Sequence, residues 1–122
     1  MQKKILIVDD EETTVQLIEF ILEKNGFITH SAENGKQALA CAKHEHPDAI
    51  LLDIMMPGMD GLEVCAALKA DESLKDIPII FLTALGQETD VARGLKLGAQ
   101  SYVTKPFNPS DLLHQVKLAL KQ

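Results

Sequence analysis

Three aspartates follow short apolar runs in this chain, and carboxylates in such positions can bind a metal ion. Asp9 and Asp10 come directly after residues 5–8, and Asp53 comes directly after residues 49–52. If these runs are neighbouring parallel strands, their carboxyl ends bring the three side chains into one cleft. Two carboxylates about 5 Å apart repel each other by roughly 3 kcal/mol at an effective dielectric constant near 20, so a proton or a cation must neutralise them. Oxygen ligands without His or Cys favour Mg²⁺.

Two more polar residues follow apolar runs and would complete a phosphoryl-transfer site. Thr83 ends the run 79–82, and Lys105 follows residues 101–103. A hydroxyl and an ammonium group can both bind phosphoryl oxygens. A carboxylate nucleophile, a divalent cation, a positive charge and a hydroxyl donor are sufficient for this chemistry. The alternative is that the aspartates only cap helices while Thr83 and Lys105 are ordinary surface residues, but their shared position at strand ends favours a site.

Five strand-like runs alternate with five helix-like segments, and this order determines how the polar residues are positioned. The predicted strands are 5–8, 27–32, 49–52, 79–82 and 101–103. The predicted helices lie at about 15–24, 35–44, 61–70, 87–97 and 109–120, with Asn34, Asp60 and Asn108 as N-caps. Such alternation predicts an α/β fold, (βα)5, with a doubly wound five-stranded parallel sheet in the flavodoxin-like order 2-1-3-4-5. The first and third strands are neighbours in that order.

The composition limits the classes of function. The 122 residues suit one compact domain, which we expect to span 1–122. The formal net charge of −6 and the lack of a basic run argue against direct binding to nucleic acid or to an anionic membrane. No apolar stretch has the length of a membrane span, and no secretory signal precedes the first strand-like run. These features predict a cytoplasmic protein.

Four segments together resemble the receiver domains of bacterial two-component response regulators, chemotaxis regulators among them. The segments are VDDE at 8–11, LDIMMPGMDG at 52–61, LTA at 82–84 and YVTKPF at 102–107. They occur in the order and at the intervals typical of that family, and the match covers nearly the whole chain. The resemblance implies a phosphoprotein of a phosphorelay, which a sensor histidine kinase or a histidine phosphotransfer protein phosphorylates in a Mg²⁺-dependent reaction.

The resemblance also implies which residues bind the phosphoryl group and the metal. Asp53 would be the phosphoacceptor. Asp10, Asp53 and the backbone carbonyl of Met55 would be the direct protein ligands of Mg²⁺. Asp9 would act on the metal more loosely, through water.

Further matched residues would bind and sense the phosphoryl group. Thr83 and Lys105 would bind the phosphoryl oxygens, and a cis peptide bond before Pro106 would direct Lys105 into the cleft. On phosphorylation, Thr83 would move toward the phosphoryl group and Tyr102 would turn inward to fill the space. Thr83 and Tyr102 are therefore the predicted switch residues.

The helix predicted at 87–97 is a candidate for the element that moves. It has a narrow apolar face and contains Gly94, which costs up to about 1 kcal/mol of helix stability, so we expect it to be weakly held. With the strand and helix that follow, it would form an output surface for a downstream effector protein or a tethered output domain. A stand-alone regulator and a receiver cut from a longer protein share this pattern, and phosphorylation-dependent homodimerisation is left open.

The residues next to the site argue against rapid turnover. Met55 lies two positions after Asp53, and Leu85 lies two positions after Thr83. Neither side chain can orient a water molecule or accept its proton, so we predict a long-lived phosphoryl-aspartate in a protein that is not an enzyme. The alternative, an aspartyl-phosphate-forming phosphohydrolase, would carry a second aspartate at the position of Met55. An FMN site is excluded because acidic residues 9–12 would repel phosphate.

Overall fold

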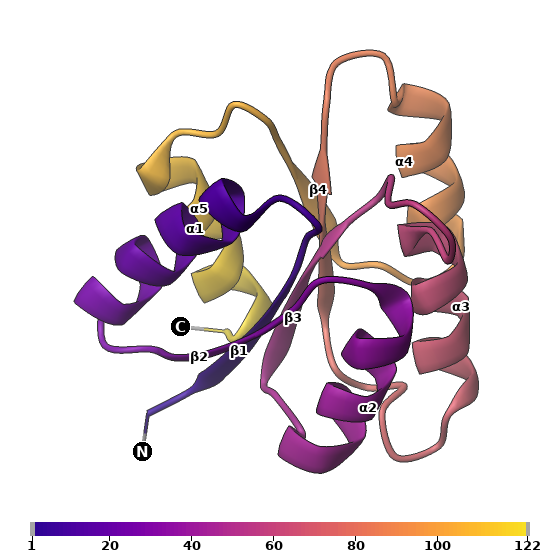
Figure 1. Cartoon of the computed structure of the whole chain (residues 1–122), viewed down its shortest axis with the longest axis horizontal. Coiled ribbons are helices and arrows are strands. Elements are labelled where there is room, and N and C mark those ends of the chain that lie inside the picture. The colour runs from indigo at the N-terminus through magenta and orange to yellow at the C-terminus, as the bar shows by residue number, and fades with distance from the viewer. Residues whose placement is uncertain (1, 122) are drawn as a thin grey trace.

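The chain folds around one parallel sheet with a helix after each strand (Figure 1). This description rests on a computed structural model that describes residues 2–121. The strands are β1 (Lys4–Val8), β2 (Ile28–Ala32), β3 (Ala49–Asp53), β4 (Ile79–Thr83) and β5 (Ser101–Thr104). Their order in the sheet is β2-β1-β3-β4-β5, and all pairs are parallel. The predicted fold class and strand order are confirmed.

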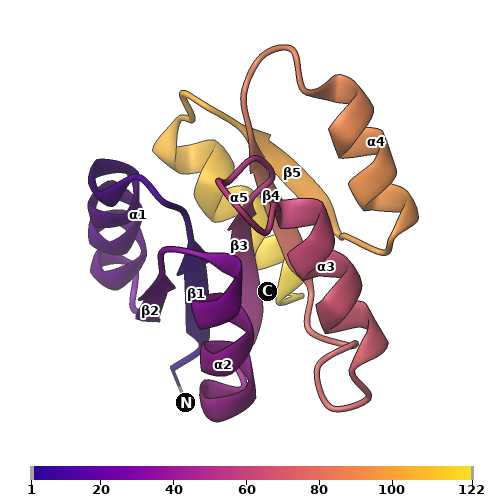
Figure 2. The ribbon, with the colours of Figure 1, turned by 45° about the vertical axis from the view of Figure 1, so that its right-hand side comes forward.

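The helices cover both faces of the sheet, as Figures 1 and 2 show. They are α1 (Glu12–Lys24), α2 (Gly35–Glu45), α3 (Gly61–Ala70), α4 (Glu88–Lys96) and α5 (Pro109–Ala119). Buried residues of α1 and α5 belong to one apolar cluster, and those of α2, α3 and α4 belong to the other. The sheet is therefore the middle layer of three. Within residues 2–121, no helix has the length and apolar character needed to cross a lipid bilayer.

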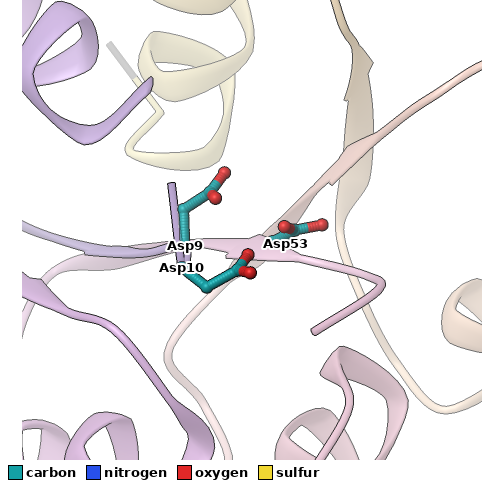
Figure 3. Close-up of side chains that lie close together, drawn as sticks. All are labelled: Asp9, Asp10 and Asp53. Carbon is teal, nitrogen blue, oxygen red and sulfur yellow. The ribbon is translucent and has the colours of Figure 1, made fainter. Parts of the chain in front are cut away.

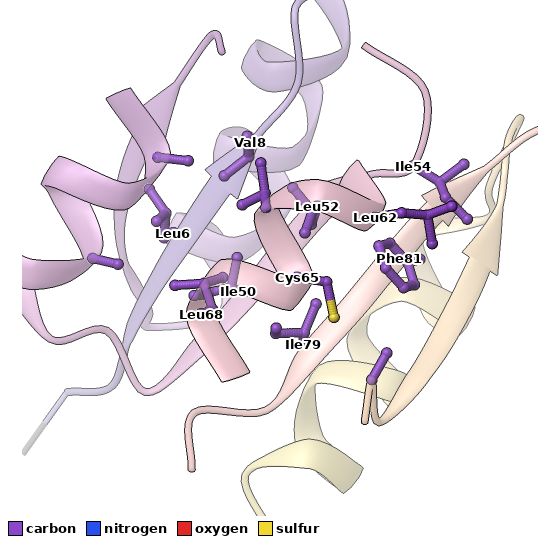
Figure 4. Packing of buried hydrophobic residues seen from close by; sticks show 14 of the residues in the cluster. Leu6, Val8, Ile50, Leu52, Ile54, Leu62, Cys65, Leu68, Ile79 and Phe81 are labelled. Atoms are coloured by element: carbon purple, nitrogen blue, oxygen red, sulfur yellow. The ribbon is translucent and has the colours of Figure 1, made fainter. Parts of the chain in front are cut away.

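Alternate residues of the central strands supply the two apolar clusters. On β3, Ile50 and Leu52 pack in the cluster with α2, α3 and α4 (Figure 4). Ala49 and Leu51, on the other face of the sheet, pack in the cluster with α1 and α5. Every residue of β3 and β4 is buried, which explains why these strands have continuous apolar sequences. β2 lies at the edge of the sheet and has a mixed pattern of exposure, which agrees with its more polar sequence.

Local signals fix where several helices begin. The Asn34 side chain accepts from the Gln37 backbone N–H at 2.9 Å, and Asp60 and Glu63 form a capping box. Asn108 caps α5, where Pro109 occupies the first turn. The three predicted N-caps are confirmed. Helices α1 and α4 differ, since their N-cap residues make no side-chain cap.

Gly94 has a packing role in α4 that helix propensity did not reveal. A Cβ atom at this position would lie 2.1 Å from Cε2 of Phe81, a buried residue of β4. The glycine therefore lets α4 approach the sheet closely. Val91 and Gly94 are the buried residues of α4, which supports the expectation of a helix with few anchoring contacts.

Candidate functional site

The predicted aspartates meet at the carboxyl ends of β1 and β3. Val8 of β1 pairs with Leu52 of β3, so Asp9 and Asp53 leave the sheet side by side. With Asp10, each offers an oxygen within 4.8 Å of the others, and the Asp10 carboxylate extends toward Asp53 (Figure 3). Among the described residues, these three form the one group of acidic, His or Cys side chains close enough to hold a metal ion.

Asp53 is buried in this cleft, and its environment penalises a negative charge. It is 6% exposed, and its Oδ1 accepts the backbone N–H of Met55 at 3.1 Å. Burial and the charge of Asp9 raise the pKa of Asp53 to about 6, although the Lys105 charge and the Met55 N–H act in the opposite direction. A cation placed beside Asp53 would therefore be stabilised.

Lys105 reaches the same cleft from the end of β5. Its Nζ lies 2.7 Å from Asp9 Oδ2, 3.5 Å from Asp53 Oδ2 and 3.6 Å from Glu11 Oε1. Burial alone would lower the pKa of Lys105, but the hydrogen bond to Asp9 and the nearby negative charges raise it above the ordinary value. The peptide bond between Lys105 and Pro106 is cis, the geometry that the resemblance implies.

Both oxygens of Asp9 already have donors. Oδ2 accepts from Lys105, and Oδ1 accepts the backbone N–H of Glu11 at 2.9 Å. Asp10 is exposed, by contrast, and is free of such contacts among the described hydrogen bonds. Sequence reasoning assigned no role to Glu11, because its contacts depend on how the chain turns from β1 into α1.

The turn after β3 is built around a close approach of backbone to backbone. Gly61, the first residue of α3, donates its N–H to the carbonyl of Ile54 at 3.0 Å. A Cβ atom on Gly61 would lie 2.3 Å from the carbonyl oxygen of Asp53. Only glycine allows α3 to begin directly beside the residue that carries the central carboxylate.

The chain matches one protein family over most of its length. The profile described as response regulator receiver domain matches residues 5–117. The chain belongs to this family. Response regulator receiver domains are phosphoacceptor switches of two-component systems and bind Mg²⁺, and nothing in the comparisons supports the alternative of a phosphohydrolase.

Two curated relatives of this receiver are transcriptional regulatory proteins. The chain is 45% identical over 122 residues to the alkaline phosphatase synthesis transcriptional regulatory protein PhoP of Bacillus subtilis, of which it covers 50%. It is 47% identical over 120 residues, or 98% of this chain, to the phosphate regulon transcriptional regulatory protein PhoB of Pseudomonas aeruginosa, of which it covers 52%. The receiver thus spans about half the length of these relatives.

Solved structures agree with the family assignment. A putative response regulator from Chloroflexus aurantiacus superposes with a TM-score of 0.95 at 34% identity, with both chains fully covered. The chemotaxis protein CheY4 of Vibrio cholerae superposes with a TM-score of 0.93 at 32% identity, over 98% of this chain and 100% of that one.

Thr83 lies at the end of β4, but its hydroxyl is engaged away from the acidic group. The side chain is 3% exposed, and Oγ1 donates to Gln87 Oε1 at 2.9 Å, with the carbonyl of Ala84 at 3.3 Å. No described hydrogen bond joins it to Asp53. Sequence reasoning missed Gln87, because no sequence signal marks a contact made across an irregular loop.

Three other residues named from the sequence lie at the surface. Met55 is 49% exposed, Leu85 is 90% exposed, and Tyr102 is 47% exposed. Tyr102 and Thr83 both line one cavity of about 340 Å³, whose other lining residues come mostly from α4 and the loop before it. The receiver therefore has space beside Thr83 that a rearranged side chain could occupy.

Proposed function

We propose that Asp53 is the phosphoacceptor of this receiver. In the reaction, an Asp53 carboxylate oxygen forms a bond to phosphorus while the bond from phosphorus to the donor breaks. With a phosphohistidine donor on a histidine kinase or phosphotransfer protein, the imidazole nitrogen keeps the electron pair and takes a proton. The observation that carries this proposal is the position of the Asp53 carboxylate, beside both the other acidic side chains and the Lys105 ammonium.

The donor set supports a Mg²⁺ site formed by Asp10, Asp53 and the backbone carbonyl of Met55. The group offers oxygen ligands and contains no His or Cys, which fits this hard cation. The raised pKa of Asp53 also fits, because a cation would stabilise its ionised carboxylate. Asp9 would act through water, since Lys105 and Glu11 already occupy both of its oxygens. When bound, the ion would neutralise charge on the transferring phosphoryl group.

Lys105 and Thr83 would bind the phosphoryl oxygens. The Lys105 ammonium is already 3.5 Å from Asp53, so it needs little movement to contact a group attached there. Thr83 would have to exchange its present hydrogen bond for one to the phosphoryl group. Tyr102 would then turn toward the cavity beside Thr83, and α4, β5 and α5 would form the output surface.

We further propose that the chain is a switch rather than a turnover enzyme. Met55 and Leu85 are exposed residues two positions after Asp53 and Thr83, and neither side chain can activate water, so the phosphorylated form should be long-lived. All of 1–122 would form one receiver domain, acting in the cytoplasm on an effector protein or on a tethered output domain. Homodimerisation on phosphorylation stays a prediction.

Intact mass tests the chemistry directly. The protein is incubated with acetyl phosphate in the presence of Mg²⁺, and parallel samples contain a chelator or the Asp53→Asn variant. We expect a gain of one phosphoryl group only when both Asp53 and the metal are present. Phosphorylation that persists in Asp53→Asn would overturn the assignment of the phosphoacceptor.

A further inference from the structure

The side chain of Gln87 joins two groups at the end of β4. Its Oε1 accepts the hydroxyl of Thr83 at 2.9 Å and the backbone N–H of Ala84 at 2.7 Å. Because the Ala84 N–H requires an acceptor, it fixes which end of the Gln87 amide faces Thr83. The hydroxyl of Thr83 must then be the donor in its hydrogen bond with Gln87.

A hydroxyl has one hydrogen, so the acceptors around Thr83 compete for it. While that hydrogen is donated to Gln87, it cannot be donated to a phosphoryl oxygen on Asp53. We propose that Gln87 is a positioning residue that holds the Thr83 hydroxyl in the unphosphorylated state and releases it when Asp53 is phosphorylated. This inference rests on the proposed function and adds the residue that regulates its switch.

Gln87 also connects this exchange to α4. It is the N-cap residue of the helix, and the preceding residue, Gly86, has a φ of +94°. The helix has no side-chain cap at its start, and it packs on the sheet through Val91 and through Gly94, which lies close to Phe81. Loss of the hydrogen bond to Thr83 therefore leaves Ala84 as the one described partner of Gln87 at the end of β4, which loosens the first turn of α4, while Gly94 keeps the other end against the sheet.

Two measurements on a set of variants test this proposal. Hydrogen exchange of the backbone amides at 84–91 reports how firmly the start of α4 is held, and intact mass reports the rate of phosphorylation by acetyl phosphate with Mg²⁺. The variants are Gln87→Ala, which removes the acceptor, and Gln87→Glu, whose carboxylate can accept both hydrogen bonds. Thr89→Ala is the matched control, since Thr89 is exposed in the same helical turn.

We expect the backbone amides at 84–91 to exchange faster in Gln87→Ala than in the wild type. We also expect Gln87→Ala to be phosphorylated about three- to tenfold faster, which corresponds to the free energy of one ordinary hydrogen bond. Gln87→Glu and Thr89→Ala should exchange as the wild type does and should not be phosphorylated faster. In a Thr83→Ala background, Gln87→Ala should leave the phosphorylation rate unchanged. That result separates positioning of Thr83 from a general effect on stability.

The outcomes distinguish this inference from the proposed function. If the wild type is phosphorylated on Asp53 but Gln87→Ala shows wild-type exchange and a wild-type rate, the role of Gln87 is overturned alone. The same holds if Gln87→Glu behaves like Gln87→Ala. If the wild type takes no phosphoryl group, both the role of Gln87 and the proposed function fail.

Discussion

At the scale of single residues, the three aspartates of the site carry more negative charge than the one nearby lysine, Lys105, can neutralise. Asp9 and Asp53 are buried, and Lys105 contacts both. The raised pKa of Asp53 means that the folded protein tolerates an ionised carboxylate there less well than the unfolded chain does. A receiver built in this way is destabilised at rest and gains stability from a cation or a neutralising change.

Replacement of Asp53 by asparagine should therefore stabilise the metal-free protein near neutral pH. Because the folded pKa of about 6 exceeds the unfolded value of 3.8, the stabilising effect of protonation is complete below about pH 4 and is lost as pH rises through 6. In chelator at pH 7.5, Asp53→Asn should be more stable than the wild type by about 1–2 kcal/mol, after allowance for solvent screening in an open cleft.

Urea unfolding of both proteins at pH 7.5 and pH 4 measures this difference. The gap should shrink toward zero at pH 4, and added Mg²⁺ at pH 7.5 should narrow it by stabilising the wild type. A variant that is less stable than the wild type at pH 7.5, or a gap that does not depend on pH, would contradict the account of Asp53.

Met55 should control how long the phosphoryl group lasts. A side-chain amide at this exposed position could orient an attacking water molecule, which the thioether cannot do. We expect Met55→Asn to shorten the lifetime of the phosphorylated protein by roughly tenfold. The measurement is the decay of phosphorylated mass after the donor is removed, with Met59→Asn, in the same loop, as the control. Equal lifetimes for the two variants would remove Met55 from the explanation.

At the scale of elements, the position of α3 depends on Gly61. Because a Cβ atom there would overlap the carbonyl of Asp53, Gly61→Ala must displace either the start of the helix or the end of β3. We expect a loss of about 1–3 kcal/mol in unfolding free energy, measured in urea, together with slower phosphorylation.

Gly35→Ala is the matched control for this prediction. Gly35 is also the first residue of a helix, but the atoms nearest to its added Cβ belong to the side chain of Met59, in the loop before α3, and not to the backbone of β3. We expect Gly35→Ala to lower the unfolding free energy by less than Gly61→Ala does and to leave the rate of phosphorylation closer to that of the wild type. Equal losses from both substitutions would show that the backbone contact at Asp53 has no special importance.

The elements were predictable from the sequence to different degrees. Strand ends and helix caps are encoded locally, so Asp9, Asp53 and the cap at Asp60 could be placed from apolar runs and spacing alone. Gly94 could not, because its value lies in contact with Phe81, which is distant in sequence. Helix propensity indicates only that Gly94 lowers the stability of the helix. Gln87 was missed for the same reason, since its partners depend on the path of an irregular loop.

At the scale of the whole molecule, the order of the strands assembles the site. The adjacent strands β1, β3 and β4 position the three aspartates and Thr83, and β5 positions Lys105. All of these residues lie at or just beyond the carboxyl ends of the strands. This arrangement follows from the alternation of strands and helices, so it could be predicted from the sequence alone. The residues at these strand ends do not determine what the receiver controls, because that depends on other surfaces and on partners. The two curated relatives compared above are about twice as long as this chain.

Chemical identification of the phosphorylated residue tests the central claim most directly. Borohydride reduces an aspartyl phosphate to homoserine, so the phosphorylated protein can be reduced, digested and sequenced by mass spectrometry. We predict homoserine at position 53 alone, and none in a sample that was never exposed to the phosphodonor. Homoserine at Asp9 or Asp10, or a phosphorylated protein without homoserine at 53, would contradict the account.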